Sequence, residues 1–188
     1  MLDLSRGPVH LSYEQGSGAT TLALSVARDV LKSGNRVKWL SRVLPDGERT
    51  SQILWDLTES ELEKFLAMEI KENLNESFKI IKYLIKGLDQ NDIVIIDDWC
   101  SKTGRASKED IEGIENIVSM AVNSKILICS TAYENMNGKQ GQWKSRGGKR
   151  IDSITRKNFL TRSLHNNSRI LKDGNNEMFI KIIGTGVE

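Results

Sequence analysis

The most constraining feature of the sequence is a run of four β-branched residues, Ile93 to Ile96, followed directly by Asp97 and Asp98. A strand without polar alternation is buried on both faces, which is typical of the interior of a parallel sheet. A second apolar run of this kind spans residues 125–129. Because parallel strands need long crossover connections, the chain is expected to alternate strands with helices in an α/β fold.

Hydrophobic periodicity predicts the remaining elements. Apolar residues at three- and four-residue spacing predict helices at residues 21–31, 74–88 and 111–122. Short β-rich runs predict strands at residues 9–12, 36–40 and 65–70, with loops at 41–49 and 135–150. An antiparallel meander is expected last, at residues 151–164, 169–172 and 178–183, with turns at 166–167 and 173–175. Together they predict a mainly parallel sheet with helices on both faces and antiparallel C-terminal strands, in a single domain of residues 1–188.

Cysteine content and hydropathy indicate a reducing compartment. The 188 residues include two cysteines, Cys100 and Cys129, too few and too far apart for a disulfide framework or a thiolate zinc site. No stretch of the sequence approaches the roughly 20 apolar residues that span a bilayer. The N-terminal residues also lack the pattern of a secretion signal. We therefore expect a cytoplasmic protein without a membrane partner.

The formal net charge of +2 conceals a strong asymmetry along the chain. Residues 135–172 carry ten Lys or Arg against a single acid, Asp152, which gives this part a net charge of +9. The other residues include 17 bases and 24 acids, a net charge of −7. Such an asymmetry indicates contact with a polyanion, although a solvated basic face has the same composition.

A glycine turn between the first predicted strand and helix has the arrangement of a phosphate-binding loop. Residues 13–21 align with G-x-x-x-x-G-K-[ST], with Gly18 and Thr20 in place, but Tyr13 replaces the first glycine and Ala19 replaces the lysine. Backbone amides at the helix N-terminus would survive these changes, whereas the point charge on the terminal phosphates would not. An ordinary strand-to-helix turn is the alternative. The candidate nucleotide-binding residues are Gly16, Ser17, Gly18, Ala19, Thr20 and Thr21.

An acid at the end of a buried strand strengthens the case for a nucleotide site. Asp97 ends the run of β-branched residues, where a carboxylate can order the ligands of Mg²⁺ at the carboxyl edge of a parallel sheet. Thr20 and Asp97 are therefore the candidate metal ligands if a nucleotide binds.

The order of these motifs resembles the single-domain RecA/RadA-type recombinase paralogs, and in particular the archaeal RadB type. The resemblance rests on residues 16–24, on the strand ending at Asp97, and on the part from Gly147-Gly148 through residues 179–182 to Gly184. It covers nearly the whole chain and leaves no room for the N-terminal helical domain of full RadA recombinases. The resemblance implies a RecA-like P-loop core, a role in DNA recombination and repair, and a recombinase or paralog subunit as partner.

The sequence departs from that family at three parts of the hydrolytic site. Ala19 replaces the lysine that contacts the phosphates in the family, and Ser130-Thr131 replaces the Asn-Gln pair that senses the terminal phosphate. Ser-Arg-Val at residues 41–43 stands where the family has the acid that activates water. The resemblance therefore implies a degenerate Walker A motif and little or no ATP hydrolysis, because each absent group costs orders of magnitude in rate. Two interpretations of the cofactor stay open: ATP or ADP with Mg²⁺, or none.

Two loops of the recombinases contact single-stranded DNA, and the resemblance places their counterparts at residues 100–108 and 134–150. Both segments are basic, and Trp143 in the second combines a stacking platform with neighbouring positive charge. Alternatively, Trp143 packs onto the body of the protein and the lysines are only solvated. The candidate nucleic-acid-binding residues are Lys102, Arg105, Lys139, Trp143, Lys144, Arg146, Lys149 and Arg150.

Three functions are consistent with these observations. The first is an accessory protein of homologous recombination and DNA repair that binds single-stranded DNA or a recombinase and does not hydrolyse ATP appreciably. The second is an ATP-dependent recombinase-like enzyme whose missing lysine comes from elsewhere, for example a neighbouring subunit; Ala19 and Thr131 argue against it. The third is a structural RecA-like subunit, as in the RNA-binding RecA-like subcomplex of Elongator. The basic segment at residues 135–172 argues against a purely structural role, although RNA would be as suitable a polyanion as DNA.

Overall fold

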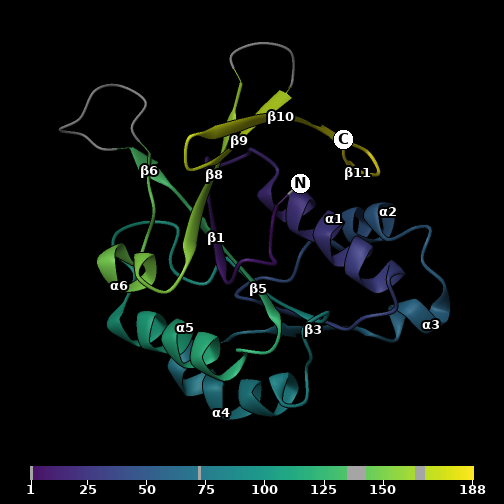
Figure 1. Ribbon diagram of the computed structural model, residues 1–188, viewed down its shortest axis with the longest axis horizontal. Coiled ribbons are helices and arrows are strands. Elements are labelled where there is room, and N and C mark those ends of the chain that lie inside the picture. Colours follow the sequence, from purple (N-terminus) through teal and green to yellow (C-terminus); the bar gives the residue numbers. More distant parts are fainter. Residues whose placement is uncertain (1, 72, 135–142, 164–167) are drawn as a thin grey trace.

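The computed structural model describes residues 2–71, 73–134, 143–163 and 168–188, and it has the α/β architecture that the sequence predicts (Figure 1). Its main sheet has nine strands. In chain order they are β1 (Val9–Tyr13), β2 (Val37–Ser41), β3 (Phe65–Glu69), β4 (Ile93–Asp97), β5 (Lys125–Thr131), β8 (Arg156–Arg162), β9 (Ser168–Asp173), β10 (Asn176–Ile183) and β11 (Gly186–Val187).

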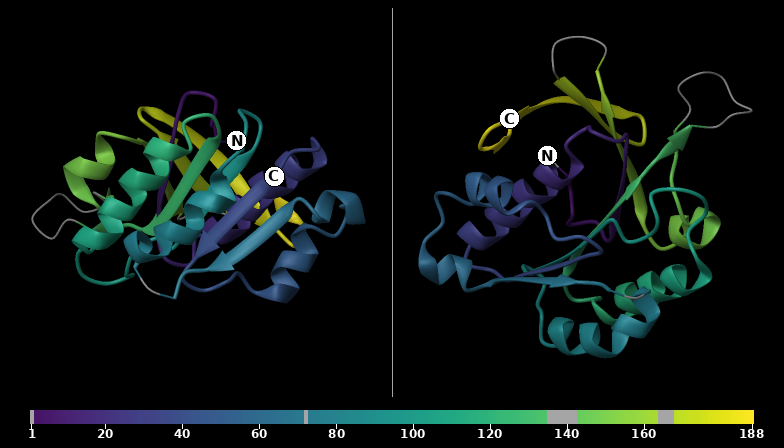
Figure 2. Two further views of the ribbon diagram at one scale, coloured as in Figure 1. Left: turned by 90° about the horizontal axis from the view of Figure 1, so that it is seen from below. Right: turned by 180° about the vertical axis from the view of Figure 1, so that it is seen from behind.

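The strands lie in the order β11-β10-β9-β8-β1-β5-β4-β2-β3. From β8 to β3 every neighbouring pair is parallel, which confirms the mainly parallel sheet expected from the buried strands. From β8 to β11 the pairs are antiparallel, and the last strand, β11, returns to lie against α1 (Figures 1 and 2).

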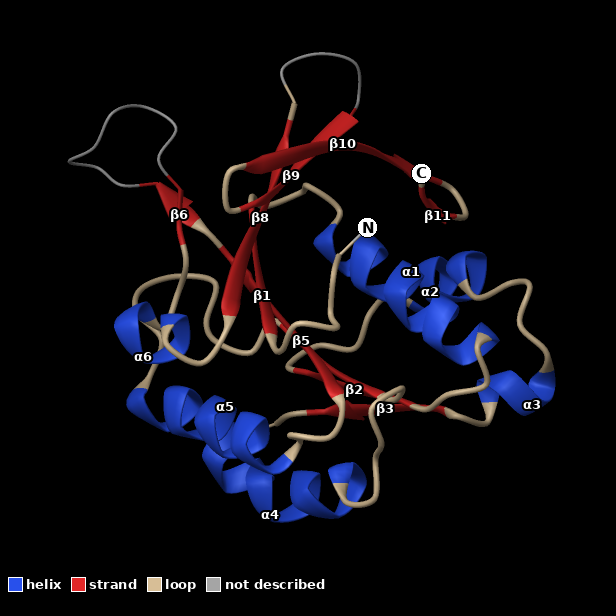
Figure 3. Cartoon of the chain, viewed as in Figure 1, coloured by secondary structure: helices blue, strands red, loops and turns tan. Residues whose placement is uncertain are grey.

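Helices cover both faces of the parallel part of the sheet (Figure 3). One face carries α1 (Ala19–Lys32), α2 (Gly47–Ile53) and α3 (Glu59–Leu62), and the other carries α4 (Leu74–Ile85), α5 (Lys108–Met120) and α6 (Gly148–Asp152). Alternate residues of β4 serve the two cores: Ile93 and Ile95 pack with α1, whereas Val94 and Ile96 pack with α4 and α5. A strand with apolar side chains on both faces is thus explained by two helical layers.

The parallel strands end at one edge of the sheet, and this carboxyl edge positions the candidate site. Ser41 at the end of β2 is the register partner of Asp97 at the end of β4. Tyr13 at the end of β1 is the register partner of Thr131 at the end of β5. The loops that follow β1, β2, β4 and β5 therefore leave the sheet side by side.

Three local predictions need correction. The predicted loop at 41–49 ends earlier, because residues 47–53 form α2, whose N-terminus is capped by the Asp46 side chain accepting a hydrogen bond from the Arg49 amide. Residues 148–152 form α6 rather than a loop and the start of a strand, since Gly147 caps a short helix that buries Ile151. The strand β8 belongs to the parallel part through β1, so the antiparallel meander begins only at its other side.

The predicted loop at 135–150 contains a short strand, β7 (Trp143–Lys144), which pairs with β6 (Tyr133–Glu134) just before the loop; the connection at 135–142 lies outside the described residues. The predicted turn at 166–167 also lies outside them. Within the described part of the chain, no helix has both the length and the apolar character needed to cross a membrane. Cys100 and Cys129 are both buried and free.

Candidate nucleotide and nucleic-acid site

The turn between β1 and α1 presents backbone amides rather than charged side chains. Gly16 and Gly18 have left-handed φ angles of 77° and 85°, and Gly18 caps α1 without a side-chain hydrogen bond. The Ser17 amide donates to the Glu14 carbonyl oxygen at 3.0 Å and closes the turn. Ala19 begins the helix and is 3% exposed. Because the first amides of a helix have no partner within it, this end of α1 favours an anion.

The two predicted metal ligands lie together at the carboxyl edge. Thr20 Oγ1 donates to Asp97 Oδ2 at 3.0 Å. Asp97 is 4% exposed, and its Oδ1 has no hydrogen-bond partner among the described residues. Burial, and then the charge of Asp98, raises the pKa of Asp97 to about 6.

A buried carboxylate oxygen without a donor is a position that a cation or a water molecule would satisfy. Thr20 and Asp97 therefore fit a Mg²⁺ ion that takes its other ligands from water and phosphate oxygens. No cluster of three or more His, Cys, Asp or Glu suited to a metal occurs in the described part of the chain. The pair consequently suits a metal that arrives with a phosphate ligand rather than one held by protein alone.

Asp98 brings together two residues from separate motifs. Lys102 Nζ lies 2.9 Å from Asp98 Oδ2, and the Tyr13 hydroxyl donates to Asp98 Oδ1. Asp98 has a φ of 49°, a left-handed conformation that is costly for a residue other than glycine. Tyr13 is thus held on Asp98, and burial followed by this hydrogen bond raises the pKa of Tyr13. The ammonium group of Lys102 is thus a cation close to the predicted metal ligand Asp97, and it comes from the loop after β4 rather than from the phosphate loop.

The C-terminal strands fold back over the phosphate loop. A methyl group built on Gly18 would lie 3.0 Å from the Ile182 Cγ1 atom, so the Ile182 side chain covers this glycine. Arg49 of α2 donates to the carbonyl oxygens of Ile183 and Gly184 at 2.7 and 2.5 Å, and its Nε donates to Thr21 Oγ1 at 3.3 Å. We call residues 182–187 the C-terminal cover.

Further contacts hold the C-terminal cover along α1. Arg28 donates to the Thr185 carbonyl oxygen at 2.8 Å. Gly186 has a φ of 133°, and a methyl group built on it would lie 2.7 Å from Ser25 Oγ, so glycine permits the close approach to α1. Sequence reasoning did not identify this cover, because its contacts end on backbone carbonyl groups that no motif marks.

The end of β2 supplies no carboxylate to activate water. Ser41 is buried beside Asp97, and its Oγ has no hydrogen-bond partner among the described residues. Arg42 pairs with Asp110 at 2.6 Å, and the side chain after it is an exposed valine. Glu69 ends β3 opposite Ser41 and is an exposed acid of the same edge that sequence reasoning missed. Its position at the end of a predicted strand was the sequence signal that could have identified it.

The sensor positions carry hydroxyl groups that bond within the fold. Ser130 Oγ lies 2.8 Å from His10 Nε2, and burial lowers the pKa of His10 to about 4. Thr131 Oγ1 accepts a hydrogen bond from Arg146 Nε at 3.1 Å. Neither side chain offers the amide that recognises a terminal phosphate in the family.

Two of the predicted nucleic-acid residues are engaged within the chain. Arg146 is 6% exposed, and its guanidinium group donates to the carbonyl oxygens of Lys102, Gly104 and Thr131. It ties the loop after β4 to the end of β5. Arg150 makes two hydrogen bonds to the Glu115 carboxylate, at 2.8 and 2.5 Å.

Three of the other predicted residues lie at the surface of the same region. Arg105, Lys144 and Lys149 are exposed and have no ion-pair partner within the part of the chain that the structure describes. Trp143 is half-buried and pairs with Glu134 in the β6–β7 hairpin. Lys102 belongs to the Asp98 pair described above, and Lys139 lies outside the described residues.

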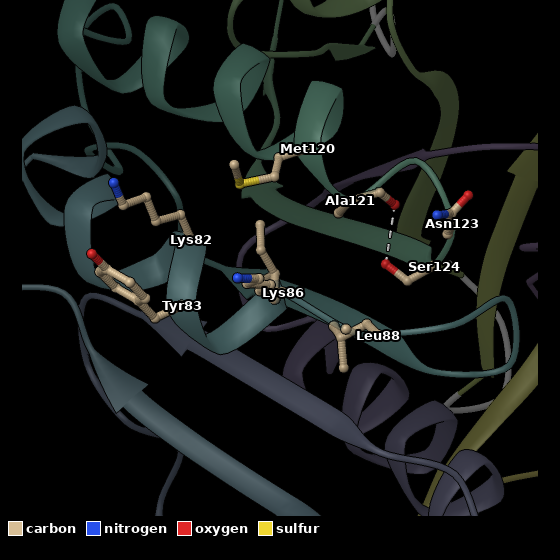
Figure 4. A pocket seen from close by; sticks show the side chains of 10 residues that line it. Lys82, Tyr83, Lys86, Leu88, Met120, Ala121, Asn123 and Ser124 are labelled. Atoms are coloured by element: carbon tan, nitrogen blue, oxygen red, sulfur yellow. Dashed lines mark hydrogen bonds between the residues drawn. The ribbon is translucent and has the colours of Figure 1, made fainter.

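A cavity of about 450 Å³ lies far from these groups, between the C-terminal ends of α4 and α5 (Figure 4). Met120 and Ala121 give it an apolar wall, Lys82 and Lys86 stand at its rim, and Ser124 Oγ donates to the Ala121 carbonyl oxygen at 3.1 Å. The residues that line it include no acid. Because both helices end near the amino ends of strands, the cavity is at the opposite edge of the sheet from Asp97.

Solved structures share this architecture. The crystal structure of the RadB recombinase matches with a TM-score of 0.68 and 15% sequence identity, over 97% of this chain and 90% of that chain. The structure of a DnaB-like replicative helicase and its interactions with primase matches with a TM-score of 0.66 and 13% identity, over 95% of this chain and 57% of the helicase chain. No protein-family model and no curated protein matches the sequence. The predicted RecA-like fold is confirmed.

Proposed function

We propose that this RecA-fold chain is a recombinase paralog that acts as an accessory protein in homologous recombination and DNA repair. It binds single-stranded DNA, a recombinase or both, and it hydrolyses little or no ATP. The observation that carries the proposal is the intact Thr20–Asp97 contact beside Ala19, which stands where an active phosphate loop needs a lysine. Thr20 and Asp97 provide the oxygen ligands for Mg²⁺, but the loop lacks the lysine charge that stabilises phosphoryl transfer.

The loss of hydrolysis follows from the charge that the loop cannot neutralise. A phosphoryl group in transfer spreads negative charge over its equatorial oxygens, and an active site places cations and donors there in advance. Ala19 contributes a methyl group, and Ser41 contributes a hydroxyl group where a carboxylate would activate water. Each missing stabiliser typically costs roughly 10²- to 10³-fold in rate. Several such losses leave a loop suited to binding rather than turnover.

ATP or ADP with Mg²⁺ is the ligand class that the remaining loop suits. The free amides of the first turn of α1 would contact phosphate, and Thr20 and Asp97 would hold Mg²⁺, which supplies positive charge at the phosphates. Ile182 of the C-terminal cover rests on Gly18, so a nucleotide would have to compete with that contact. We expect weak nucleotide binding.

The β6–β7 hairpin region supports a role with nucleic acid. Lys144 and Lys149 are exposed without an ion pair among the described residues, and Trp143 lies next to the first of them. Unpaired cations release counterions when they contact phosphates, and an aromatic side chain adds stacking without sequence preference. Single-stranded DNA is therefore expected to bind weakly and with a strong dependence on salt.

Separate titrations test the proposal. Fluorescence anisotropy with labelled single-stranded DNA and with RNA, across salt concentrations, measures polynucleotide binding, and release of phosphate from ATP measures turnover. We expect salt-sensitive binding of a single strand that weakens in the Trp143→Ala, Lys144→Ala double variant. ATP turnover should stay at background, with or without DNA. A turnover comparable with active recombinases and abolished by Asp97→Ala would overturn the proposal, and an unchanged affinity in the double variant would remove these two residues from the interface.

A second function, an ATP-dependent enzyme completed by a lysine from outside the loop, is favoured by one observation. Lys102 Nζ lies 2.9 Å from Asp98, the residue next to Asp97. If Lys102 served as the phosphate cation, Lys102→Ala would abolish ATP hydrolysis. Lys108→Ala is the matched control, because Lys108 is an exposed lysine of the next helix that pairs with Glu112 at 3.6 Å. Under the accessory-protein proposal neither the unaltered chain nor either variant turns over ATP.

A further inference from the structure

A cavity of about 440 Å³ opens at the base of the β6–β7 hairpin. Its walls come from the loop after β4, from β6 and from the start of α6. We call it the hairpin pocket, and the lining residues used below are Gly104, Arg105, Ala106, Tyr133, Arg146, Gly147 and Gly148.

An aromatic ring held in place forms one wall of the hairpin pocket. Tyr133 is 46% exposed, and the Arg146 guanidinium carbon lies 5.7 Å from the centre of its ring. Arg146 is itself fixed by hydrogen bonds to the carbonyl oxygens of Lys102, Gly104 and Thr131. The ring therefore has a rigid cation on one side and remains accessible to a ligand.

The remaining walls are low and mostly apolar. A methyl group built on Gly104 or on Gly148 would meet no other atom within 4 Å, so the backbone at both positions faces open space. Ala106 adds a small apolar surface, and Gly147 adds backbone without a side chain. Such walls suit a flat group that stacks on Tyr133 and offers its edge to backbone groups.

Positive charge surrounds this opening without a partner in the described chain. Arg105 lines the pocket and is exposed. Lys144 is the register partner of Tyr133 across the hairpin, and Lys149 follows Gly148. A ligand with a flat aromatic part and flanking negative charges matches this arrangement, and a nucleotide unit of a single strand has both.

We propose that one unstacked base of a single-stranded DNA chain enters the hairpin pocket and stacks on Tyr133, while Arg105 and Lys144 contact the flanking phosphates. This inference rests on the proposed function, because it requires DNA binding, and it names the part of the DNA that the surface recognises. Every base has an aromatic face, so the pocket accepts bases with little sequence preference. The phosphate contacts set affinity and salt dependence, and Tyr133 adds selection for a strand that carries bases.

Two oligonucleotides with the same phosphates distinguish the base from the backbone. The probes are fluorescently labelled oligo-dT and an abasic oligonucleotide of the same length, titrated by anisotropy at several salt concentrations. We expect the unaltered chain to prefer oligo-dT by roughly 5- to 100-fold, in line with the stacking of one base. Tyr133→Ala should lose most of this preference, with an unchanged salt slope. Tyr133→Phe, which keeps the ring, should keep the preference.

The outcomes separate this inference from the proposed function. Oligo-dT affinity in Tyr133→Ala equal to that of the unaltered chain would overturn the hairpin pocket and leave DNA binding intact, as would loss of the preference in Trp143→Ala but not in Tyr133→Ala. Absence of binding of both probes by the unaltered chain would overturn the DNA-binding part of the proposed function and the pocket with it. Circular dichroism checks folding, and if Tyr133→Ala does not fold, a lack of preference in the unaltered chain and in Tyr133→Phe overturns the pocket.

Discussion

The phosphate loop and the β6–β7 hairpin region lie at the same carboxyl edge of the sheet, but they differ in whether their basic side chains are bonded within the fold. Around the phosphate loop, Arg28 and Arg49 donate to carbonyl oxygens of the C-terminal cover, and Lys102 pairs with Asp98. In the hairpin region, Lys144 and Lys149 have no ion-pair partner among the described residues. Positive charge at the first site holds the fold together, whereas at the second it is available to a ligand.

Under the proposed function, the comparison explains how one edge of the sheet can lose nucleotide hydrolysis and retain contact with a polynucleotide. Nucleotide hydrolysis needs a cation at a fixed point of the phosphate loop, and Ala19 removes it while Ile182 covers the neighbouring glycine. Contact with a polynucleotide needs only several exposed cations and an aromatic ring in the same region. The first requirement fails with a single substitution, whereas the second tolerates many.

Arg146→Ala should have the largest effect, because Arg146 belongs to the hairpin region by sequence but holds the fold together. The substitution leaves the buried carbonyl oxygen of Thr131 and the part-buried contacts of the Lys102 and Gly104 carbonyl oxygens without this donor. Losses of this kind are expected to lower the free energy of unfolding by about 3 kcal/mol. Urea denaturation followed by circular dichroism measures the change.

Lys149→Ala is the matched control for Arg146→Ala. Lys149 is three residues away and exposed, so its removal should change the free energy of unfolding by no more than about 0.5 kcal/mol while weakening DNA binding at low salt. An Arg146→Ala variant that unfolds like the unaltered chain but no longer binds DNA would place Arg146 with the ligand-binding cations and contradict the assignment made above.

Asp97→Asn should stabilise the protein at neutral pH, since the phosphate loop holds a buried carboxylate without full compensation. In the folded chain the pKa of Asp97 is raised from 3.8 to about 6, so folding favours its protonated form. This stabilisation is complete below pH 3.8 and is lost as the pH rises through about 6. An amide side chain does not ionise, so the Asp97→Asn variant keeps this stabilisation at every pH. Its free energy of unfolding at neutral pH is expected to exceed that of the unaltered chain by about 2–3 kcal/mol.

Chemical denaturation at a series of pH values measures this difference. The unaltered chain and Asp97→Asn should have nearly equal stabilities below about pH 4 and should diverge as the pH rises to about 6. Asp152→Asn is the control, because Asp152 accepts hydrogen bonds from Ser145 and Lys157 near the surface and should lose stability rather than gain it. A gap that stays constant with pH would contradict the raised pKa of Asp97.

The order of strands and helices could be predicted because burial patterns are local in sequence. The run from Ile93 to Ile96 predicted an interior strand, and its last acid predicted the contact with Thr20, since parallel strands end at a common edge. The parallel pairing of β8 with β1 could not be predicted, because it depends on the path of the chain through α6. Register between distant strands is a tertiary property.

Two features of the site depend on burial rather than on residue type. Arg146 and Lys149 lie in the same basic segment, and only the structure distinguishes the buried hydrogen-bonding arginine from the exposed lysine. Arg49 bonds to Ile183 and Gly184, residues more than a hundred positions away in the sequence, through carbonyl groups that every residue carries. Composition therefore predicted that this edge is basic, but not which cations remain available.

Ile182→Ala should have a smaller effect than Arg146→Ala or Asp97→Asn, and it tests whether the C-terminal cover weakens nucleotide binding. Removing the side chain that rests on Gly18 should raise the affinity for ADP with Mg²⁺ by roughly 3- to 10-fold, because a larger fraction of molecules then has an open loop. Isothermal titration calorimetry measures the dissociation constant. Ile183→Ala is the control, since adjacent residues of a strand point to opposite faces, and it should leave the affinity unchanged.

Ala19→Lys sharpens this test because it returns the missing cation to the phosphate loop. With Ile182 in place the new lysine shares the space over Gly18 with the cover, so the gain in affinity should be small. In the Ala19→Lys, Ile182→Ala double variant the gain should exceed the product of the two single gains, since each change removes a separate obstacle to the same phosphate. Equal gains with and without Ile182 would show that the cover is not what limits access to the loop. Hydrolysis should remain at background in every variant, because Ser41 still stands where an activating carboxylate is needed.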